Sequence, residues 1–340
     1  MTSPGSGAPV HADRLSSLTT LLGDTDEALR RGAPAGARVW PTGFPLLDQA
    51  LTGGLRSGEL ALLGGSHGEG KTTIGLQMVR NAVAAGGVGV VFSYEHEAHT
   101  LLERLVSLEA AERVGHAAAR VHQVRNAFEG GSGGLSLAQL LGGLNGGQEA
   151  YAALTAYGDR LHIHESSGAT TTLDEVSAVI KRVAERAGDA PMVLLDYLQK
   201  VPMLEAEEEA RITAVAEGLK DMALEIGSPI MAVSAADKDA LVAGHRMRTH
   251  DLRGSSSLAY EADVVMLLGD KASIVSREHL VYDLGNMERF KQMSVLSLEK
   301  NRHGRSGMAL EFLKDFEHGR FDTRGDAVSE RLIDERVILS

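Results

Sequence analysis

The sequence predicts an α/β fold in which a mostly parallel central sheet is flanked by helices. Short apolar runs without polar interruptions, such as residues 88–93 and 192–196, recur along the chain, and helical stretches separate them. Unbroken apolar strands are typical of a sheet that is covered on both faces, and the intervening helices supply the crossovers that parallel strands require. A third observation is a glycine-rich segment, residues 64–70, placed directly between an apolar strand and a helix.

The order of the elements follows from these patterns. Residues 1–11 are rich in Ser, Pro and Gly and predict a disordered tail, and leucines at helical spacing predict an arm helix within residues 12–36. A main domain at 37–322 and a C-terminal tail at 323–340 follow. We expect strands at 59–63, 88–93, 161–164, 192–196, 230–234, 264–268 and 293–298, and helices at 71–84, 99–112, 173–187 and 210–224. The glycine-rich stretch 129–147 predicts a loop with a short helix at 136–144.

Composition narrows the class of protein. With 340 residues, 43% of them hydrophobic and 24% charged, the chain has the size and balance of one large globular domain. It contains no run of about 20 apolar residues and no signal peptide, so we expect no membrane span. The absence of cysteine fits a reducing, cytoplasmic setting. A net charge of −12 restricts any nucleic-acid contact to local basic loops.

The strongest motif matches the pattern G-x-x-x-x-G-K-[ST] and is followed by a helix. Its residues, with the next threonine, are Gly65, Ser66, His67, Gly68, Glu69, Gly70, Lys71, Thr72 and Thr73. The glycines let backbone N–H groups close around phosphates, and the helix N-terminus adds partial positive charge. Lys71 is expected to reach the β- and γ-phosphates of ATP, and the Thr72 hydroxyl is expected to bind Mg²⁺. The motif therefore predicts a nucleotide site with ATP and Mg²⁺ as ligands.

Two carboxylates are candidates for the remaining chemistry. Asp196 ends an apolar strand downstream of the nucleotide loop, which is where a second Mg²⁺-holding group is expected. Glu95 ends the strand that follows the loop's helix, where a carboxylate can orient the attacking water and accept its proton. Glu97, two residues later, is the alternative base.

Several further segments share their order with a known family. They are TGF at 42–44, LD at 47–48, GGLRSG at 53–58, FSYE at 92–95, LDYLQ at 195–199, DLRGS at 251–255, AD at 262–263 and KNRHG at 300–304. Together they make residues 20–322 resemble the RecA-like ATPase domain of the DnaB-type replicative helicases. The resemblance implies a RecA-like P-loop NTPase fold with an N-terminal helical arm and a C-terminal β-hairpin.

The resemblance also implies roles for individual residues. Glu95 corresponds to the family's catalytic base. Arg302 corresponds to an arginine finger that reaches the neighbouring subunit's γ-phosphate, and Lys300 is its partner. ATP hydrolysis would then depend on a homo-oligomer, a hexameric ring, in which the helix at 23–31 docks on the adjacent subunit.

A basic loop is the candidate contact for single-stranded DNA. Arg253 lies in the family's DNA-binding segment, with Arg246 and Arg248 close before it in the sequence. Contacts between arginines and phosphates are electrostatic and independent of sequence, so they weaken with salt.

The chain departs from the family at four places. One is the DNA loop, where residues 254–257 have none of the acidic character that relatives carry. Only about forty residues precede the main domain, so we expect the N-terminal helical domain that binds primase to be missing. Ala235 stands where the family usually carries a glutamine that senses the γ-phosphate. An acidic run at 205–209 would repel a polyanion if it faced the central channel of the ring.

These observations leave two functions open. The first is an ATP-driven helicase or translocase on single-stranded DNA, which the DYLQ and DLRG segments favour. The second is a ring ATPase that serves as a nucleotide-dependent switch or scaffold for an unidentified protein partner, without helicase activity. Ala235, the acidic run and the net charge favour the second.

Overall fold

The computed structural model describes residues 15–32, 35–131, 133–203, 207–237, 246–276, 279 and 284–333. The predicted tail at 1–11 lies outside the described residues, as do positions 334–340 of the predicted C-terminal tail. The chain forms two compact units, Met1–Arg38 and Val39–Ser340. The first contains α1 (Leu18–Arg30), which begins where the Ser17 hydroxyl accepts a hydrogen bond from the Thr20 N–H at 3.1 Å. No residue of α1 is buried.

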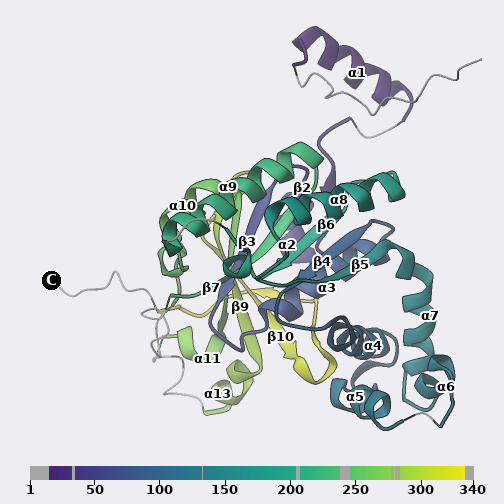
Figure 1. Cartoon of the computed structure of the whole chain (residues 1–340). Coiled ribbons are helices and arrows are strands. Elements are labelled where there is room, and N and C mark those ends of the chain that lie inside the picture. Colours follow the sequence, from purple (N-terminus) through teal and green to yellow (C-terminus); the bar gives the residue numbers. More distant parts are fainter. Residues whose placement is uncertain are drawn as a thin grey trace, which may run out of the picture. The chain divides into compact units, whose positions relative to one another are not determined.

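The second unit is built on one extended sheet (Figure 1). Within the described part of the chain this sheet has ten strands in the order β11-β10-β9-β8-β3-β7-β6-β4-β5, and β12 pairs with β10. Its strands are β3 (Leu60–Gly65), β4 (Gly89–Ser93), β5 (Leu161–Glu165), β6 (Met192–Asp196), β7 (Ile230–Ala235), β8 (Val264–Asp270), β9 (Met293–Asn301), β10 (Met308–Asp315), β11 (Arg320–Phe321) and β12 (Asp326–Ala327). A separate pair joins β1 (Val39–Trp40) to β2 (Leu55–Arg56).

The direction of the strands matches the prediction. From β8 to β5 all neighbours run parallel, whereas β9 and β10 form an antiparallel hairpin beside β8. All seven predicted strands are present, and the predicted α/β fold with a mostly parallel sheet is confirmed. The β9–β10 pair is the expected C-terminal hairpin.

Helices cover both faces of the sheet. The helices are α2 (Pro45–Ala50), α3 (Lys71–Ala84), α4 (Ala98–Val114), α5 (Val121–Glu129), α6 (Leu137–Gly142), α7 (Gly147–Tyr157), α8 (Leu173–Ala187), α9 (Glu208–Ile226), α10 (Ser255–Glu261), α11 (Lys271–Ile274) and α13 (Leu284–Lys291). Short 3₁₀ turns include η1 (Gly115–Ala117) and η6 (Phe316–His318). No helix in the described ranges is both long enough and apolar enough to cross a lipid bilayer.

The core consists of two apolar layers, one on each face of the sheet. Along β3, Leu63 packs into the layer that contains α3, and its neighbour Leu62 packs into the layer that contains α8 and α9. Along β6, Leu194 and Leu195 divide in the same way. Because successive side chains of a strand point to opposite faces, a sheet buried on both sides requires the unbroken apolar runs seen in the sequence.

The region 121–157 contains two helices that were not predicted. The short helix α6 lies inside the predicted stretch 129–147, and α5 and α7 flank that stretch on either side. Both pack with α4 around a small core of their own that includes Val106, Val124 and Ala150. Val124 is the one buried residue of α5, and Val121, Val124 and Phe128 recur at helical spacing, so the sequence did carry a pattern for this helix.

Candidate nucleotide-binding site

A cavity of about 630 Å³ opens at the carboxyl ends of the parallel strands. Ligands of open α/β sheets bind in this place because the loops after several strands converge there. The cavity is lined by His67, Gly68, Gly70, Lys71, Thr72, Thr73, Glu95, His96, Arg104, Val121, Arg125, Asp196, Tyr197, Val233, Ala235, Ala236, Arg253, Phe316 and Gly319. Most of the predicted nucleotide motif is therefore brought together with both predicted acidic residues.

The glycines of the motif allow a backbone path that other residues would strain. Gly68 and Gly70 have φ of +81° and +93°, in the left-handed region. Gly70 is also the N-cap of α3, and a Cβ there would come within 2.8 Å of the Phe316 ring. The loop therefore turns tightly into the N-terminus of a 14-residue helix, the arrangement that favours an anion such as phosphate.

Lys71 lies folded over this loop. Its Nζ donates hydrogen bonds to the carbonyl oxygens of Gly65 at 2.8 Å and Ser66 at 2.7 Å. Burial lowers the pKa of Lys71, and the carboxylates of Asp196 and Glu95 oppose that shift. A bound anion would offer this ammonium group a charged partner in place of the two carbonyls.

Thr72 and Asp196 form the candidate cation site. The Thr72 Oγ1 donates to Asp196 Oδ2 at 2.5 Å, and Asp196 is only 2% exposed. Burial raises the pKa of Asp196 to about 6 and the Glu95 carboxylate adds to this, whereas Thr72, Lys71 and Arg104 act in the opposite direction. A divalent cation would stabilise this buried negative charge, and hydroxyl and carboxylate oxygens are the ligands that Mg²⁺ prefers. The residues present therefore fit Mg²⁺.

Glu95 and Glu97 occupy different positions. β4 and β6 are parallel neighbours with Ser93 opposite Asp196, and the Tyr94 N–H donates to the Asp196 carbonyl at 2.8 Å. This pairing brings Glu95 into the cavity wall beside Lys71. Glu97 is exposed, is the N-cap residue of α4 and is not among the cavity-lining residues. The geometry favours Glu95 as the candidate base.

The cavity also contains cationic residues that sequence reasoning missed. Arg104, two turns into α4, is half-buried, and one of its side-chain nitrogens lies 3.4 Å from His96 Nε2. Burial lowers the pKa of Arg104, and the Asp196 carboxylate opposes that shift. Arg125, from α5, pairs with Glu103 at 2.9 Å. Arg104 follows Glu95 closely in the sequence, and this proximity could have identified it. Arg125 was missed because α5 was not expected.

Lys300 and Arg302 lie at the opposite end of the sheet. Asn301 pairs with Val264 at the start of β8, whereas Gly65 pairs with Leu268 near its end. At about 3.3 Å per residue, roughly 13 Å of strand separates the two levels. Neither basic residue lines the cavity, and the Arg302 side chain is 51% exposed.

Contacts within the chain hold both side chains at that end. Lys300 Nζ donates to the Ala259 carbonyl at 2.7 Å, and an Arg302 side-chain nitrogen lies 3.3 Å from Asp263 Oδ1. Burial and the neighbouring Arg302 charge lower the pKa of Lys300. The pair is therefore positioned to face something other than its own nucleotide loop.

The three arginines of the predicted DNA loop have separate partners. Arg253 lines the cavity and pairs with Glu208 of α9 at 2.6 Å. Arg248 pairs with Glu299 at 3.0 Å, and Arg246 donates to Ser297 Oγ at 3.3 Å, both on β9.

The acidic run at 205–209 is described only in part, because residues 205 and 206 lie outside the described residues. Glu208 and Glu209 form the first turn of α9, where acidic side chains complement the helix dipole.

Ala235 is contacted by a different glutamine. Gln199 Oε1 accepts from the Ala235 N–H at 3.1 Å, and Gln199 Nε2 donates to Ser234 Oγ at 3.0 Å. The Arg253 N–H in turn donates to the Ala235 carbonyl at 3.1 Å. Gln199 thus links the segment after Asp196 to β7 and to the Arg253 loop, a role that sequence reasoning did not assign.

Comparison with known proteins places this geometry in a family. The family described as DnaB-like helicase C terminal domain matches residues 40–322. The chain is 28% identical over 231 residues to the replicative DNA helicase DnaB of Haemophilus influenzae, covering 67% of this chain and 45% of that protein. It thus spans less than half the length of this relative.

Two solved structures share the fold. The first is an isolated ATPase domain that superposes with a TM-score of 0.68 at 20% identity, covering 88% of this chain and 98% of that domain. The second, a DnaB-like replicative helicase solved in a study of its interactions with primase, has a TM-score of 0.68 at 19% identity and covers 87% of this chain and 66% of that one. Both confirm the RecA-like fold.

Proposed function

This chain belongs to the DnaB-like helicase C-terminal domain family, and from that premise we propose that it is a ring ATPase that acts on single-stranded DNA as a helicase or translocase. One observation carries the proposal. The nucleotide loop, Asp196 and Glu95 converge on one cavity, whereas Lys300 and Arg302 lie at the far end of the same sheet. Such a chain would supply the nucleotide-binding half of one ATPase site at the cavity, and at its far end the basic residues that complete the site of a neighbouring chain.

In this proposal the main residues around the nucleotide cavity each have a role in ATP hydrolysis. The backbone of residues 65–73 and Lys71 bind the phosphates of ATP, and Thr72 with Asp196 holds Mg²⁺, which would neutralise phosphate charge when bound. Glu95 orients the attacking water and accepts its proton. Arg104 adds a positive charge from the same chain, opposite Asp196.

The complementary half requires a second subunit. Arg302 and Lys300 of one chain would reach the γ-phosphate held by its neighbour, since roughly 13 Å of strand separates them from their own loop. The exposed leucines of α1, which include Leu18 and Leu22, supply an apolar face for docking on an adjacent subunit. Repetition of this contact around a closed hexamer would give every site its arginine finger.

DNA binding would use the loop that contains Arg253, with Arg248 and Arg246 as neighbours. Arg253 reaches both the nucleotide cavity and, through its backbone, Ala235 and Gln199. A change at the γ-phosphate would therefore be transmitted to the DNA-binding loop through a short chain of hydrogen bonds.

A second candidate function rests on the ion pair between Arg253 and Glu208. An arginine already held by a carboxylate is a weaker phosphate ligand. This observation favours a ring ATPase that works as a nucleotide-dependent switch or scaffold for a protein partner and does not move along DNA.

The steady-state ATPase rate with and without single-stranded DNA separates the two. A motor is expected to show strong stimulation that decreases between low and moderate salt, because the contacts are electrostatic. The Lys71→Ala variant controls for contaminating ATPases. A rate that is indifferent to DNA would contradict the motor and support the switch.

A further inference from the structure

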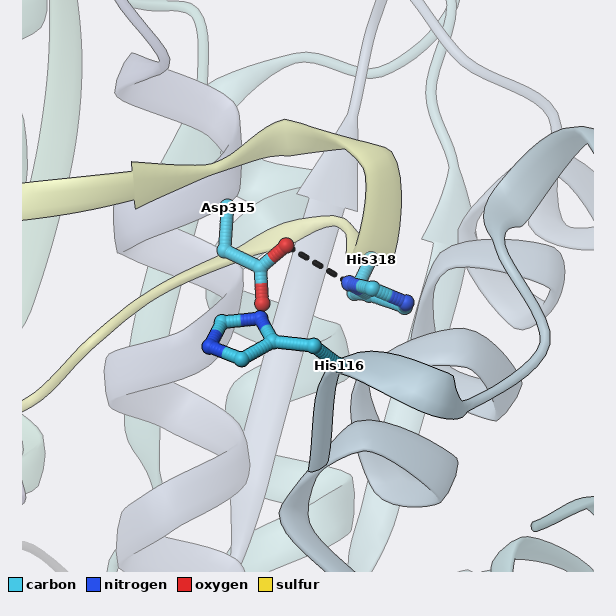
Figure 2. Close-up of side chains that lie close together, drawn as sticks. All are labelled: His116, Asp315 and His318. Carbon is cyan, nitrogen blue, oxygen red and sulfur yellow. Dashed lines mark hydrogen bonds and ion pairs between the residues drawn. The ribbon is translucent and has the colours of Figure 1, made fainter. Parts of the chain in front are cut away.

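A cluster of two histidines and an aspartate lies beside the nucleotide cavity and has no part in the proposed ATPase. Asp315 ends β10, His318 ends the turn η6 that follows, and His116 comes from η1 after α4 (Figure 2). Each offers one ligand atom, and these atoms all lie within 4.8 Å of one another. We propose that His116, Asp315 and His318 bind a transition-metal ion of the Zn²⁺ type.

The hydrogen bonds of His318 decide which of its ring nitrogens is available. Nε2 lies 3.2 Å from the carbonyl oxygen of Ala118, which can only accept, so Nε2 carries a hydrogen and donates it. In the neutral ring Nδ1 then has a free lone pair. A histidine that donates one N–H to a backbone carbonyl and presents its other nitrogen is the usual form of a metal-bound histidine.

That lone pair faces a carboxylate. His318 Nδ1 lies 2.6 Å from Asp315 Oδ1, and His318 is buried. A nitrogen lone pair and a carboxylate oxygen repel each other at this distance unless a cation lies with them. A proton fits this distance as it stands, and a tetrahedral Zn²⁺ in its place would move the two ligand atoms to about 3.3 Å apart. These two atoms therefore need a cation between them.

The Asp315 carboxylate is oriented to act as a metal ligand. Its second oxygen, Oδ2, accepts from Arg320 Nε at 2.9 Å, and Arg320 is itself paired with Glu112 at 2.7 Å. The Arg320 guanidinium therefore orients the carboxylate and favours its ionised form, which is the form that binds a metal ion.

His116 completes the set from the solvent side. It is exposed, and its ring lies against the Asp315 carboxylate in Figure 2. An exposed third ligand leaves a path for the ion to enter and room for water as a fourth ligand. Two imidazole nitrogens and one carboxylate oxygen suit Zn²⁺, whereas Mg²⁺ prefers oxygen ligands throughout.

The location gives the metal a consequence for the nucleotide. Phe316 and Gly319, on either side of His318, line the nucleotide cavity. A metal that joins η1 to η6 would hold this part of the cavity wall in place, so that occupancy of the two sites would be coupled.

Calorimetric titration of Zn²⁺ into nucleotide-free, chelator-stripped full-length protein tests the site. A large excess of Mg²⁺ in the buffer occupies the oxygen ligands of Thr72 and Asp196. We expect one Zn²⁺ per chain, and we expect His116→Ala to weaken binding by about tenfold or more. Because His116 is exposed, its loss does not threaten folding. His122→Ala, which removes an exposed imidazole from nearby α5, is the matched control and should bind like the wild type.

Two further measurements make the outcome decisive. Co²⁺ in place of Zn²⁺ should give the visible absorption of a four-coordinate ion, and Asp315→Asn should abolish it. Failure to bind one equivalent of Zn²⁺, or binding that is unchanged in His116→Ala, would overturn the proposal and leave a proton between His318 and Asp315. Neither assay uses ATP or DNA, so the result is independent of the proposed function.

Discussion

The two ends of the central sheet differ in how completely they are built. At the carboxyl ends of β3, β4 and β6, a buried aspartate, a half-buried lysine and a glycine loop surround one cavity within a single chain. At the other end, Arg302 is half exposed and makes only one ion pair, with Asp263, among the described residues. The difference is the basis of our proposal that one end binds the nucleotide and the other meets a neighbouring subunit.

Loss of Arg302 should have the largest effect on turnover. Arg302→Ala is expected to lower kcat by about 10³–10⁵-fold while nucleotide affinity stays near the wild-type value, because the finger acts mainly on the transition state. ATPase assays and fluorescent-nucleotide titration measure the two quantities. Arg305→Ala, in the same exposed turn, is the control. Loss of tight nucleotide binding in Arg302→Ala would contradict its assigned role.

Mixing two inactive variants sharpens this prediction. Rings that combine Arg302→Ala with Glu95→Gln chains place an intact arginine next to an intact nucleotide loop at some interfaces. Recovery of ATPase activity on mixing is expected if Arg302 acts on the neighbour. If it acted on its own chain, no combination would recover activity.

Glu95→Gln should have the next largest effect. We expect kcat to fall by about 10²–10⁴-fold with ATP still bound, since an amide cannot accept the proton of the attacking water. Glu97→Gln is the matched control, because Glu97 does not line the cavity. Full activity in Glu95→Gln would shift the base to Glu97.

The ionised Asp196 carboxylate should lower the stability of the folded protein when no metal ion is bound. Its raised pKa means that the folded protein holds this proton more tightly than the unfolded chain, so the group's contribution to stability falls as pH rises from about 4 to about 6. Asp196→Asn should therefore stabilise the metal-free protein by on the order of 2–3 kcal/mol at pH 8 and by little at pH 4. Urea denaturation at both pH values measures this. An equal gain at both would show that ionisation is not the cause.

Glu208 should have the smallest effect. Glu208→Gln releases Arg253 from an exposed ion pair, and such pairs contribute up to about 1 kcal/mol, so affinity for single-stranded DNA should rise by about fivefold or less. Fluorescence anisotropy with a labelled oligonucleotide measures the change. Glu217→Gln, also exposed on α9, removes the same charge without touching Arg253. An equal gain in DNA affinity in both variants would show that the change in net charge, and not the release of Arg253, is the cause.

Sequence patterns predicted the elements whose structure depends on residues that are close together in the sequence. The strands, the glycine loop and α3 were predicted because each has its own signature in consecutive residues. α7 was missed because its apolar pattern is weak, whereas α5 was missed although Val121, Val124 and Phe128 recur at helical spacing. The roles of Arg302 and Lys300 came from resemblance alone.

The sequence by itself determined the fold class, the nucleotide loop and the residue types available for catalysis, because backbone conformation and burial pattern are properties of short segments. Only the tertiary structure decided which residues meet. It brought Arg104 and Arg125 to the cavity, Gln199 to Ala235, and His116 to Asp315 and His318. The physical reason is that the order and register of strands set distances between residues far apart in the chain, and no local pattern encodes that order.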